Sequence, residues 1–499
     1  MLLTAVLVIP ALGALVAALV PARFDRAGRV VAAVAAALTL VAAALLAVDR
    51  DPPPDGVLRP WHQVDLAWVP SLDLRWHVGV DGISYPLVVL TALLTLLCAG
   101  FTVARVPGGR HGRHLAALLL VIEVGILGTF LALDLVLFFV FFEVVLLPMF
   151  AVIAVWGGPG RRHAARKFVL YTLLGSVLLL VGVFTVVVGA GTADLVALSD
   201  GAGATMTYGT QLAAFVLLAI AFAVKSPLWP LHTWLPDAHT EAPTVGSVIL
   251  AGVLLKMGTY GLIRVAVGVA PDAARDVAPT LGVLAVAAIL VGSLVCLAQT
   301  ELKRLIAYSS VGHMGFVLLG IATLSPAGVR AALVANIAHG VITGLLFFLA
   351  GAIKDRAHTG DLAALGGLRE TAPALSGLLG YAAIASLGLP GLAGFWGEAF
   401  AVLAAMQRGG PLWTTLGVLG AVGGALTAAY FLRLLRRVTH GEATPAVAGL
   451  GDAGRLSRAE LWAWAPLVAL TLVLGVAPAL VVAVADAPVT ALTGVVAAE

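Results

Sequence analysis

Six ionisable side chains stand in strongly apolar stretches of this sequence, where a charge is costly. They are Glu143, Lys225, Lys256, His313, His339 and Glu398. Such groups mark functional sites by default, because they are tolerated in an apolar setting only when paired, hydrogen-bonded or neutral. Carboxylates, ammonium groups and imidazoles on separate helices suit stepwise proton transfer, since a change of pairing at one member shifts the proton affinity of the next. The set predicts proton transfer, and nothing in it suggests a solute pocket or a redox centre.

Lys225 stands where an apolar run, Leu212 to Val224, meets two prolines. Pro227 and Pro230 each remove an amide donor, so carbonyls in the preceding turn lose their helical partners. A broken helix is tolerated at membrane depth only where it is buried in protein or lines a water-filled cavity. We expect the freed carbonyls to admit water beside Lys225; the alternative is a simple proline kink with a lysine that reaches the surface.

The acids upstream of this stretch differ in how clearly they can be interpreted. Glu143 lies within a Phe-rich apolar run and has no polar neighbour along its helix. We expect it to pair with Lys225; a permanently neutral, hydrogen-bonded Glu143 is the alternative. Glu123 is either a proton relay or a buried polar contact. Asp134, in a very short connection between two apolar runs, is predicted at the membrane interface.

Three further groups continue the line. Lys256 is surrounded by apolar residues and by glycines, which let neighbouring helices approach closely. Neutral histidine both donates and accepts, so His313 and His339 on successive helices can pass protons along a bundle. A single buried histidine would more often be structural, and it is the combination with Lys256 that favours a relay.

The elements that hold these residues are membrane-spanning helices. The chain of 499 residues is 61% hydrophobic and only 11% charged, with a mean hydropathy of +1.06, whereas soluble domains carry about a quarter charged residues. At roughly 20 apolar residues per span, we predict an all-α polytopic membrane protein with about 14 spans. The first run lacks a basic start and a cleavage site, so we expect a retained helix. The spans are predicted to start near Leu2, Val30, Gly82, Leu115, Leu133, Phe168, Leu212, Pro243, Leu281, Leu305, Val329, Leu375, Pro411 and Leu461.

A second broken helix is predicted in the twelfth span. Gly388, Pro390 and Gly391 interrupt its apolar run, and Glu398 stands beside the break. Glu398 is assigned to the proton line; a purely structural glutamate is the alternative. Paired broken helices point to internal repeats, here spans 4–8 and 9–13, whose odd number of helices implies inverted topology. The predicted divisions are residues 1–110 (spans 1–3 and an outer loop), 111–270 (first repeat), 271–440 (second repeat) and 441–499 (last span).

The basic pI of about 9.0 is a topology signal. Most of the 29 Lys and Arg residues fall in the loops after spans 1, 3, 5, 9, 11 and 13, which by the positive-inside rule places both termini on the outer side. Arg264 is assigned to an outer loop, which leaves only Lys225 and Lys256 as basic residues inside the membrane. The polar segment from Asp49 to Val80 is assigned to the outer side, and Asp81 is predicted to cap the next helix.

Several functions are excluded by what the motifs lack. Cys98 and Cys296 are isolated in apolar runs, so the chain carries no CxxC metal site, iron–sulfur site or disulfide framework. The sequence from Gly449 to Gly454 matches GxGxxG by chance, because no strand precedes it. We therefore expect no cofactor, metal or nucleic acid bound by this chain.

From about Val78 to Arg437 the chain resembles the antiporter-like membrane subunits of proton-pumping NADH:quinone oxidoreductase (complex I) and of the related multisubunit sodium/proton antiporters. The motifs that carry the resemblance are Phe141-Phe142-Glu143 with Pro148-Met149, Lys225-Ser-Pro-Leu-Trp-Pro-Leu-His232-Thr-Trp-Leu-Pro-Asp237-Ala-His239, and Ala242-Pro-Thr-Val-Gly-Ser with Lys256.

The resemblance implies fourteen helices, two inverted five-helix repeats and broken helices 7 and 12. It implies an input-side pair, Glu143 and Lys225, a central Lys256 and a terminal Glu398. A supporting role is predicted for Glu123, Asp134, His232 and Asp237. The position of Glu398 is lysine in most members and glutamate in the M-type subunits of complex I, so the resemblance is to that group. An L-type subunit would add a long lateral helix, whereas we expect this chain to end after its fourteenth span.

The resemblance also implies a setting and partners. FMN, iron–sulfur clusters and quinone are expected in partner subunits of an NADH:quinone oxidoreductase, and antiporter-like subunits L and N are expected as neighbours in a bacterial plasma membrane. Two alternatives remain: a subunit of a multisubunit sodium/proton antiporter or membrane-bound hydrogenase, and a passive scaffold, against which the cost of burying so many charges argues.

Overall fold

The computed structural model describes residues 1–48, 56–70, 74–450 and 454–497. Within these ranges, 14 helices are long and apolar enough to cross a membrane, and the predicted all-α membrane fold is confirmed. Residues 49–55 of the predicted outer segment and residues 451–453 of the GxGxxG sequence lie outside the described ranges.

The first half of the bundle follows the predicted order. It comprises α1 (Leu2–Leu19), α2 (Asp25–Leu45), α3 (Tyr85–Ala104), α4 (Gly112–Leu131), α5 (Leu135–Val144), α6 (Leu146–Trp156), α7 (Arg161–Ala190), α9 (Tyr208–Lys225) and α10 (Trp234–Glu241). α5 and α6 together form the fifth span. The eighth span is wound as α11 (Thr244–Ile249), the π-helical η6 (Leu250–Leu254), α12 (Leu255–Gly261) and the π-helical η7 (Leu262–Val267).

The second half comprises α13 (Pro271–Ala298), α14 (Leu302–Ala322), α15 (Pro326–Ala357), α17 (Pro373–Ser386), α18 (Ala393–Arg408), α19 (Gly410–Thr439), α21 (Arg458–Val476) and α22 (Ala479–Ala497), with the short α16 (Leu368–Thr371) and α20 (Pro445–Ala448). The predicted twelfth span is divided into α17 and α18, each too short to cross alone. α22 was not predicted: the apolar sequence continues past the fourteenth span, and Pro478 separates the two helices.

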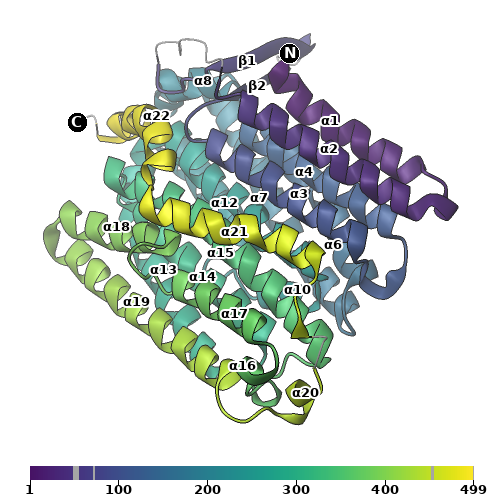
Figure 1. Ribbon diagram of the computed structural model, residues 1–499. Helices are drawn as coiled ribbons and strands as arrows, with labels where there is room; N and C mark the ends of the chain where they lie inside the picture. The colour runs from purple at the N-terminus through teal and green to yellow at the C-terminus, as the bar shows by residue number, and fades with distance from the viewer. Residues whose placement is uncertain (49–55, 71–73, 451–453, 498–499) are drawn as a thin grey trace.

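Two short backbone bridges support the inverted repeats. Asp134, before α5, bridges Asp194, which caps the one-turn helix α8 (Leu195–Ala197) after α7. Glu301, before α14, bridges Asp361, which caps a one-turn helix after α15. The first bridge lies with α8 and the second near α16, at opposite ends of the bundle (Figure 1). The same connection at opposite ends is what inverted five-helix units require.

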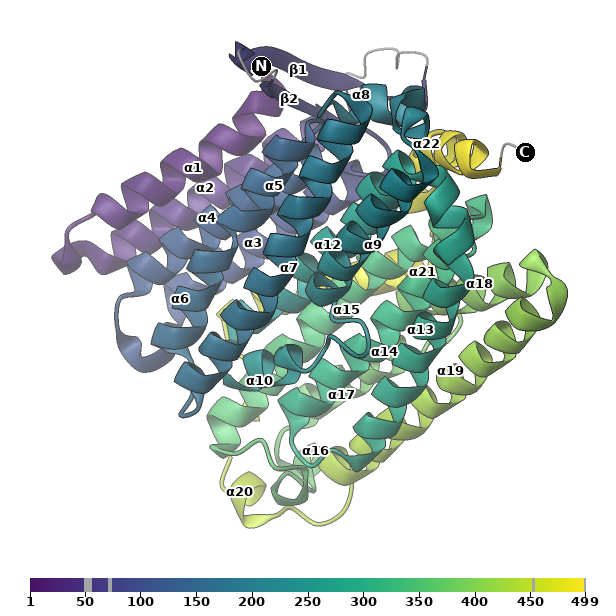
Figure 2. The same cartoon turned by 180° about the vertical axis from the view of Figure 1, so that it is seen from behind.

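One end of the bundle carries a small sheet and both chain ends. β1 (His62–Val69) pairs antiparallel with β2 (Leu74–Val80), so the predicted outer segment contains a hairpin that sequence reasoning did not specify. The hairpin, α8, the start of α1 and α22 lie together at this end, and α16 and α20 lie at the other (Figures 1 and 2).

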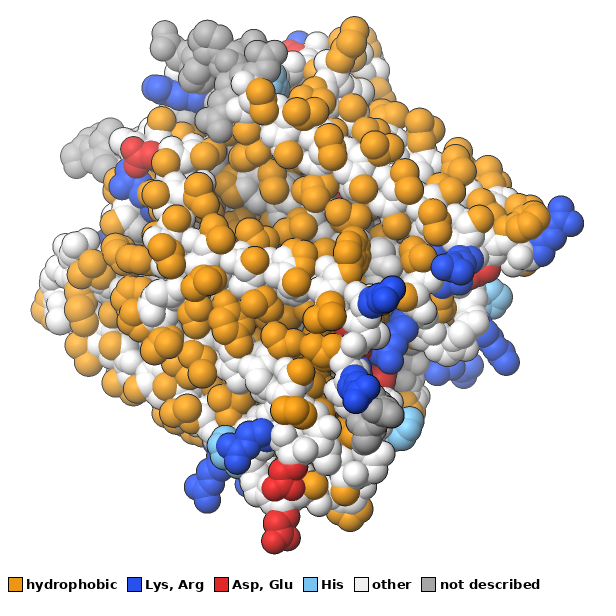
Figure 3. Space-filling view, viewed as in Figure 1, with side chains coloured by type: hydrophobic (Ala, Val, Ile, Leu, Met, Phe, Trp, Pro, Cys, Tyr) orange, Lys and Arg blue, Asp and Glu red, His pale blue; other side chains and the backbone are white. Residues whose placement is uncertain are grey.

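The surface agrees with a membrane setting. Hydrophobic side chains cover the broad face formed by α1, α2, α19 and α21, and most of the visible Lys and Arg side chains gather at the end opposite the hairpin (Figure 3). Four basic residues that the sequence assigned to a loop are helical, since Arg161, Arg162, Arg166 and Lys167 lie in the first turns of α7. The charge asymmetry between the two ends nevertheless follows the predicted one.

Candidate functional site

The first helix break lies directly after Lys225. α9 ends at this residue, and the chain is not helical again until Trp234. The amide of Leu228 donates to the carbonyl of Ala223 at 2.9 Å, and the indole nitrogen of Trp234 donates to the carbonyl of Val224 at 3.0 Å. The break is confirmed, but the expectation of free carbonyls beside Lys225 is wrong for these two, because nearby protein donors satisfy them.

The eighth span packs directly against this break. The hydroxyl of Ser226 donates to the carbonyl of Leu255 at 3.3 Å. A Cβ atom at Gly258 would clash with the Ser226 side chain and would lie 2.6 Å from the carbonyl oxygen of Phe222. Glycine therefore permits the close approach of α12 to the end of α9, which places the helices of Lys225 and Lys256 side by side.

Lys225 is buried, and its ammonium nitrogen lies 4.6 Å from the centre of the Phe142 ring, a cation–π contact. Glu143, the next residue after that ring, is half-buried and accepts a hydrogen bond from the hydroxyl of Ser176 on α7 at 2.5 Å. In the described part of the chain, no ion pair within 4.0 Å joins Glu143 to Lys225. The two predicted partners, Glu143 and Lys225, therefore come from neighbouring helices, but in the structure the Lys225 ammonium contacts the Phe142 ring and not the Glu143 carboxylate.

Lys256 lies near the centre of the eighth span, in which every residue from Val245 to Val267 is buried. Its Nζ atom donates to the carbonyl of Ala251, in the π-helical turn, at 2.5 Å and lies 2.7 Å from Nδ1 of His339 on α15. π-Helical turns are frequent at functional sites. A Cβ atom at Gly340 would lie 2.6 Å from the carbonyl oxygen of Gly252, so small residues bring α15 close enough for this contact. An imidazole nitrogen can accept a proton from an ammonium group and return it.

His313 on α14 contacts both sides of the second break. Its Nδ1 lies 2.6 Å from Oε1 of Glu398 on α18, and its Nε2 lies 3.0 Å from the hydroxyl of Ser386, the last residue of α17. α18 begins only at Ala393, so Pro390 falls within the break, as predicted. Both nitrogens of one imidazole are engaged, which allows the ring to take a proton at one nitrogen and release one at the other.

A small cavity lies between the two contacting pairs. His313, His339, Ser386 and Glu398 line it together with Ile342, Thr343 and small residues, and its volume of about 20 Å³ is room for a water molecule. The ring centres of the two histidines are 5.7 Å apart, and Nε2 of His339 has no hydrogen-bond partner in the structure. The structure thus brings Lys256, His339, His313 and Glu398 into one line with a single gap of water size.

The four supporting residues do not join this line. Glu123 on α4 is fully buried, and neither carboxylate oxygen has a hydrogen-bond partner in the structure, so its relay role stays a prediction and no buried polar contact replaces it. Asp237 pairs with Lys167 at 2.7 Å and with Arg304 at 3.1 Å, an arrangement that joins α7, α10 and α14. His232 is buried, and its ring forms a T-shaped pair with that of Tyr308 at 6.0 Å between ring centres.

Asp134 caps α5 and is more buried than predicted. Its carboxylate accepts hydrogen bonds from the amides of Val136 at 2.9 Å and Leu137 at 2.8 Å, and only 1% of the residue is exposed. Burial raises the pKa of this carboxyl above its ordinary value in spite of the two amide donors. Its place in the short connection is as predicted, but its structural partners are backbone groups.

Sequence reasoning missed one buried cation. Arg264 was assigned to an outer loop, whereas it lies in η7, is 1% exposed and pairs with Asp81. Asp81 also accepts hydrogen bonds from the amides of Ile83 and Ser84 at 3.0 Å, so it holds the turn before α3, whereas the N-cap position of that helix is taken by Ser84. The signal in the sequence was the apolar run on both sides of Arg264, which continues the eighth span.

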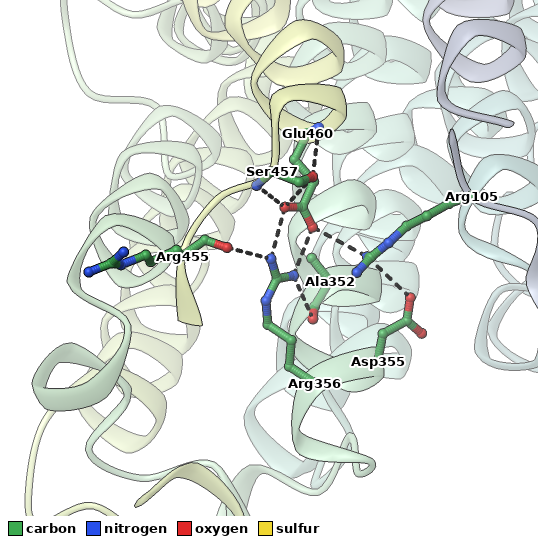
Figure 4. Close-up of polar contacts among 7 residues, drawn as sticks. All are labelled: Arg105, Ala352, Asp355, Arg356, Arg455, Ser457 and Glu460. Atoms are coloured by element: carbon green, nitrogen blue, oxygen red, sulfur yellow. Dashed lines mark hydrogen bonds and ion pairs between the residues drawn. The ribbon is translucent and has the colours of Figure 1, made fainter. Parts of the chain in front are cut away.

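A buried acid in the last span was also missed. Glu460 is fully buried and accepts two hydrogen bonds of 2.8 Å from the guanidinium of Arg356 on α15 and one of 3.3 Å from Arg105, at the end of α3. Ser457 and Glu460 form a capping box at the start of α21 (Figure 4). The S-x-x-E signature before an apolar run could have identified this cap, but not its arginines.

The comparisons with known proteins agree with this geometry. A family model described as NADH:quinone oxidoreductase/Mrp antiporter, TM, matches residues 132–424. The NADH-quinone oxidoreductase subunit M of Rhodobacter capsulatus is 42% identical over 92% of this chain and 88% of its own length.

Two solved structures extend the likeness. A chain of respiratory complex I from Thermus thermophilus with bound NADH superposes with a TM-score of 0.85 at 31% identity, over 99% of both chains. A chain of the Mrp complex from Dietzia sp. DQ12-45-1b, at 24% identity, has a TM-score of 0.83 over all of this chain and 52% of its own, which shows a shared fold. The chain therefore belongs to the NADH:quinone oxidoreductase/Mrp antiporter family of membrane subunits, in which its likeness is to the M subunits of NADH-quinone oxidoreductase.

Proposed function

We propose that this chain is the M-type subunit through which an NADH:quinone oxidoreductase moves protons across the membrane. The line Lys256, His339, His313 and Glu398 is the observation that carries the proposal. Two contacts of 2.7 and 2.6 Å and one cavity of water size connect the four groups. Four proton-binding groups, from α12, α15, α14 and α18, are brought together inside the bundle. Burying ionisable groups at membrane depth costs free energy, and a passive scaffold would have no use for them.

Glu143 and Lys225 form the input side of the proposed route. The Lys225 ammonium lies against Phe142, and Ser226 joins the end of its helix to Leu255, the neighbour of Lys256. A change in the pairing of Glu143 and Lys225 alters the field at Lys256 and so favours proton transfer to His339. Glu123 keeps a supporting role in the proposal, since it is a buried carboxylate whose oxygens have no hydrogen-bond partner in the structure.

The redox chemistry belongs to partner subunits. We infer that FMN, iron–sulfur clusters and quinone are bound elsewhere in the assembly, and that the neighbours in the membrane are antiporter-like subunits L and N. Within the described residues no group of three His, Cys, Asp or Glu side chains could hold a metal ion, and Cys98 and Cys296 are buried single thiols. This chain would contribute the proton path of the enzyme.

We infer that the chain spans a bacterial plasma membrane with both termini on the outer side. The start of α1 and α22 lie at the same end as the hairpin, and the opposite end carries most of the visible basic side chains (Figure 3). Basic residues are retained on the cytoplasmic side. The orientation can be checked by labelling of a single cysteine introduced near Met1 in intact cells.

The proposed role is tested by Lys256→Met in the whole complex in lipid vesicles. The change removes the central proton carrier with little loss of volume, so NADH-driven proton pumping and the quinone reduction coupled to it should fall at least about tenfold. Lys354→Met is the matched control, because Lys354 is 39% exposed and pairs with Glu301 at 3.6 Å. Undiminished pumping by assembled Lys256→Met would contradict the proposal, and sodium-dependent exchange without NADH would favour the antiporter alternative.

A further inference from the structure

Lys256 shares one buried helix face with Tyr260 and Arg264. The three residues follow at intervals of four along the eighth span, which places their side chains over one another. Each is at most 1% exposed, and the guanidinium carbon of Arg264 lies 5.9 Å from the centre of the Tyr260 ring. The face leads from the proposed proton line towards the end of the bundle that carries the hairpin.

The groups beyond Lys256 on this face are all held in place. The hydroxyl of Tyr260 donates to the carbonyl of Phe130 at 3.1 Å, so its proton is already committed. Arg264 is paired with Asp81, and its Nε and Nη1 atoms are buried without hydrogen-bond partners. The guanidinium is the last group of the face before the turn at Asp81.

The hairpin end of this face is covered by α22. Gly82 follows Asp81 directly, and a Cβ atom there would clash with the backbone carbonyl of Val484 in α22. The turn that holds Arg264 is therefore packed against the last helix, with Asp81 only 2% exposed. The charge pair is buried, since each of the two side chains is only 2% exposed.

We infer that Arg264, held by Asp81, is the outer seal of the Lys256 site. A guanidinium remains charged and offers donors but no acceptor, so it cannot receive a proton from water and pass it on. A fixed positive charge in a narrow path also repels protons. Lys256 is thereby closed to the outer side along its own span, and its protons leave through His339, His313 and Glu398. This inference rests on the proposed function.

The test is passive proton leak through the whole complex in lipid vesicles without NADH, followed as the decay of an imposed pH gradient. Arg264→Gln removes a fixed positive charge at about 12 Å from Lys256, eight residues along a helix. One unit of charge at that distance, at an effective dielectric constant of about 20, changes the proton occupancy of Lys256 about tenfold. The leak should rise about tenfold in Arg264→Gln, and it should also rise in Arg264→Lys, because a buried lysine, unlike a guanidinium, can lose and regain a proton.

A double variant separates the seal from a folding defect. Asp81→Asn with Arg264→Gln leaves no unpaired buried charge, and asparagine can still accept the amide hydrogen bonds that form the turn. If Arg264 is the seal, this variant also leaks, and it decides the question even if Arg264→Gln alone does not assemble. A tight double variant would overturn the inference, because the leak of the single variant would then come from the unpaired Asp81.

The matched control is Asp65→Asn with Arg75→Gln, a pair on the hairpin whose side chains are 35% and 39% exposed. It should leave the leak unchanged. NADH-driven pumping is recorded on the same vesicles. Loss of pumping in the parent would contradict the proposed function, whereas parental leak in an assembled Arg264 double variant would contradict the seal alone.

Discussion

The contact between His313 and Glu398 gives the sharpest test of the proposed route. The two side chains are 10% and 14% exposed and meet at 2.6 Å. Hydrogen bonds that involve a charged group contribute about 1.5–3 kcal/mol net. Glu398→Gln preserves the shape of the side chain and removes the charge, so the state with the proton on His313 loses about that amount. Its population then falls by a factor of roughly 10 to 150.

The assay is NADH-driven acidification of vesicles that contain the whole complex. If protons must pass His313 to reach Glu398, pumping and the quinone reduction coupled to it fall at least about tenfold in Glu398→Gln. NADH oxidation by the peripheral subunits with a soluble electron acceptor should be unchanged. Asp486→Asn is the control, since that carboxylate is 58% exposed and pairs with Arg330. Parental pumping by an assembled Glu398→Gln complex would refute the reasoning.

Two further predictions concern local structure. Gly258→Ala should push α12 away from the break after Lys225 and cost about 1–3 kcal/mol of stability, which would lower the midpoint of thermal unfolding of the purified complex. Gly209→Ala is the control and should be tolerated, because a Cβ atom there meets nothing within 4 Å. Equal midpoints for the two variants would contradict the argument from packing. Burial raises the pKa of Asp194, but hydrogen bonds from His77 at 2.7 Å and from backbone amides outweigh it, and the net pKa is lowered from 3.8. A lowered pKa stabilises the folded state above 3.8 and the stabilisation is lost at lower pH, so amide exchange in β2, corrected for its intrinsic dependence on pH, should accelerate below about pH 4. The acceleration should be weaker in His77→Gln, and an identical pH dependence in both proteins would count against the His77 contact.

Local sequence was sufficient for the breaks and for the charged groups near them. Pro227 and Pro230 cannot donate backbone hydrogen bonds, so α9 had to end near Lys225 whatever surrounded it. Gly388, Pro390 and Gly391 divide the twelfth span for the same kind of reason. An ionisable residue in an apolar run can be recognised from the sequence alone, and all six members of the predicted line were proposed in this way.

Interpretations that depended on neighbours were less successful. The carbonyls at the first break are satisfied by Leu228 and Trp234, which no local rule indicates. Arg264 was assigned to a loop because charge alone was used to end the eighth span. The structure buries it against Asp81, which precedes it by 183 residues. α22 was missed because one apolar run contains two helices on either side of Pro478.

The sequence by itself determined which groups are ionisable at membrane depth and where helices must break, because backbone donors, prolines and apolar runs act within a few residues. Only the tertiary structure decided which groups meet. Lys256 and His339 are 83 residues apart, and His313 and Glu398 are 85. Their contacts follow from glycine-lined helix faces such as Gly252 against Gly340. Packing of whole helices sets such distances, since side chains far apart in the chain come within hydrogen-bonding reach only when the backbones between them are in place.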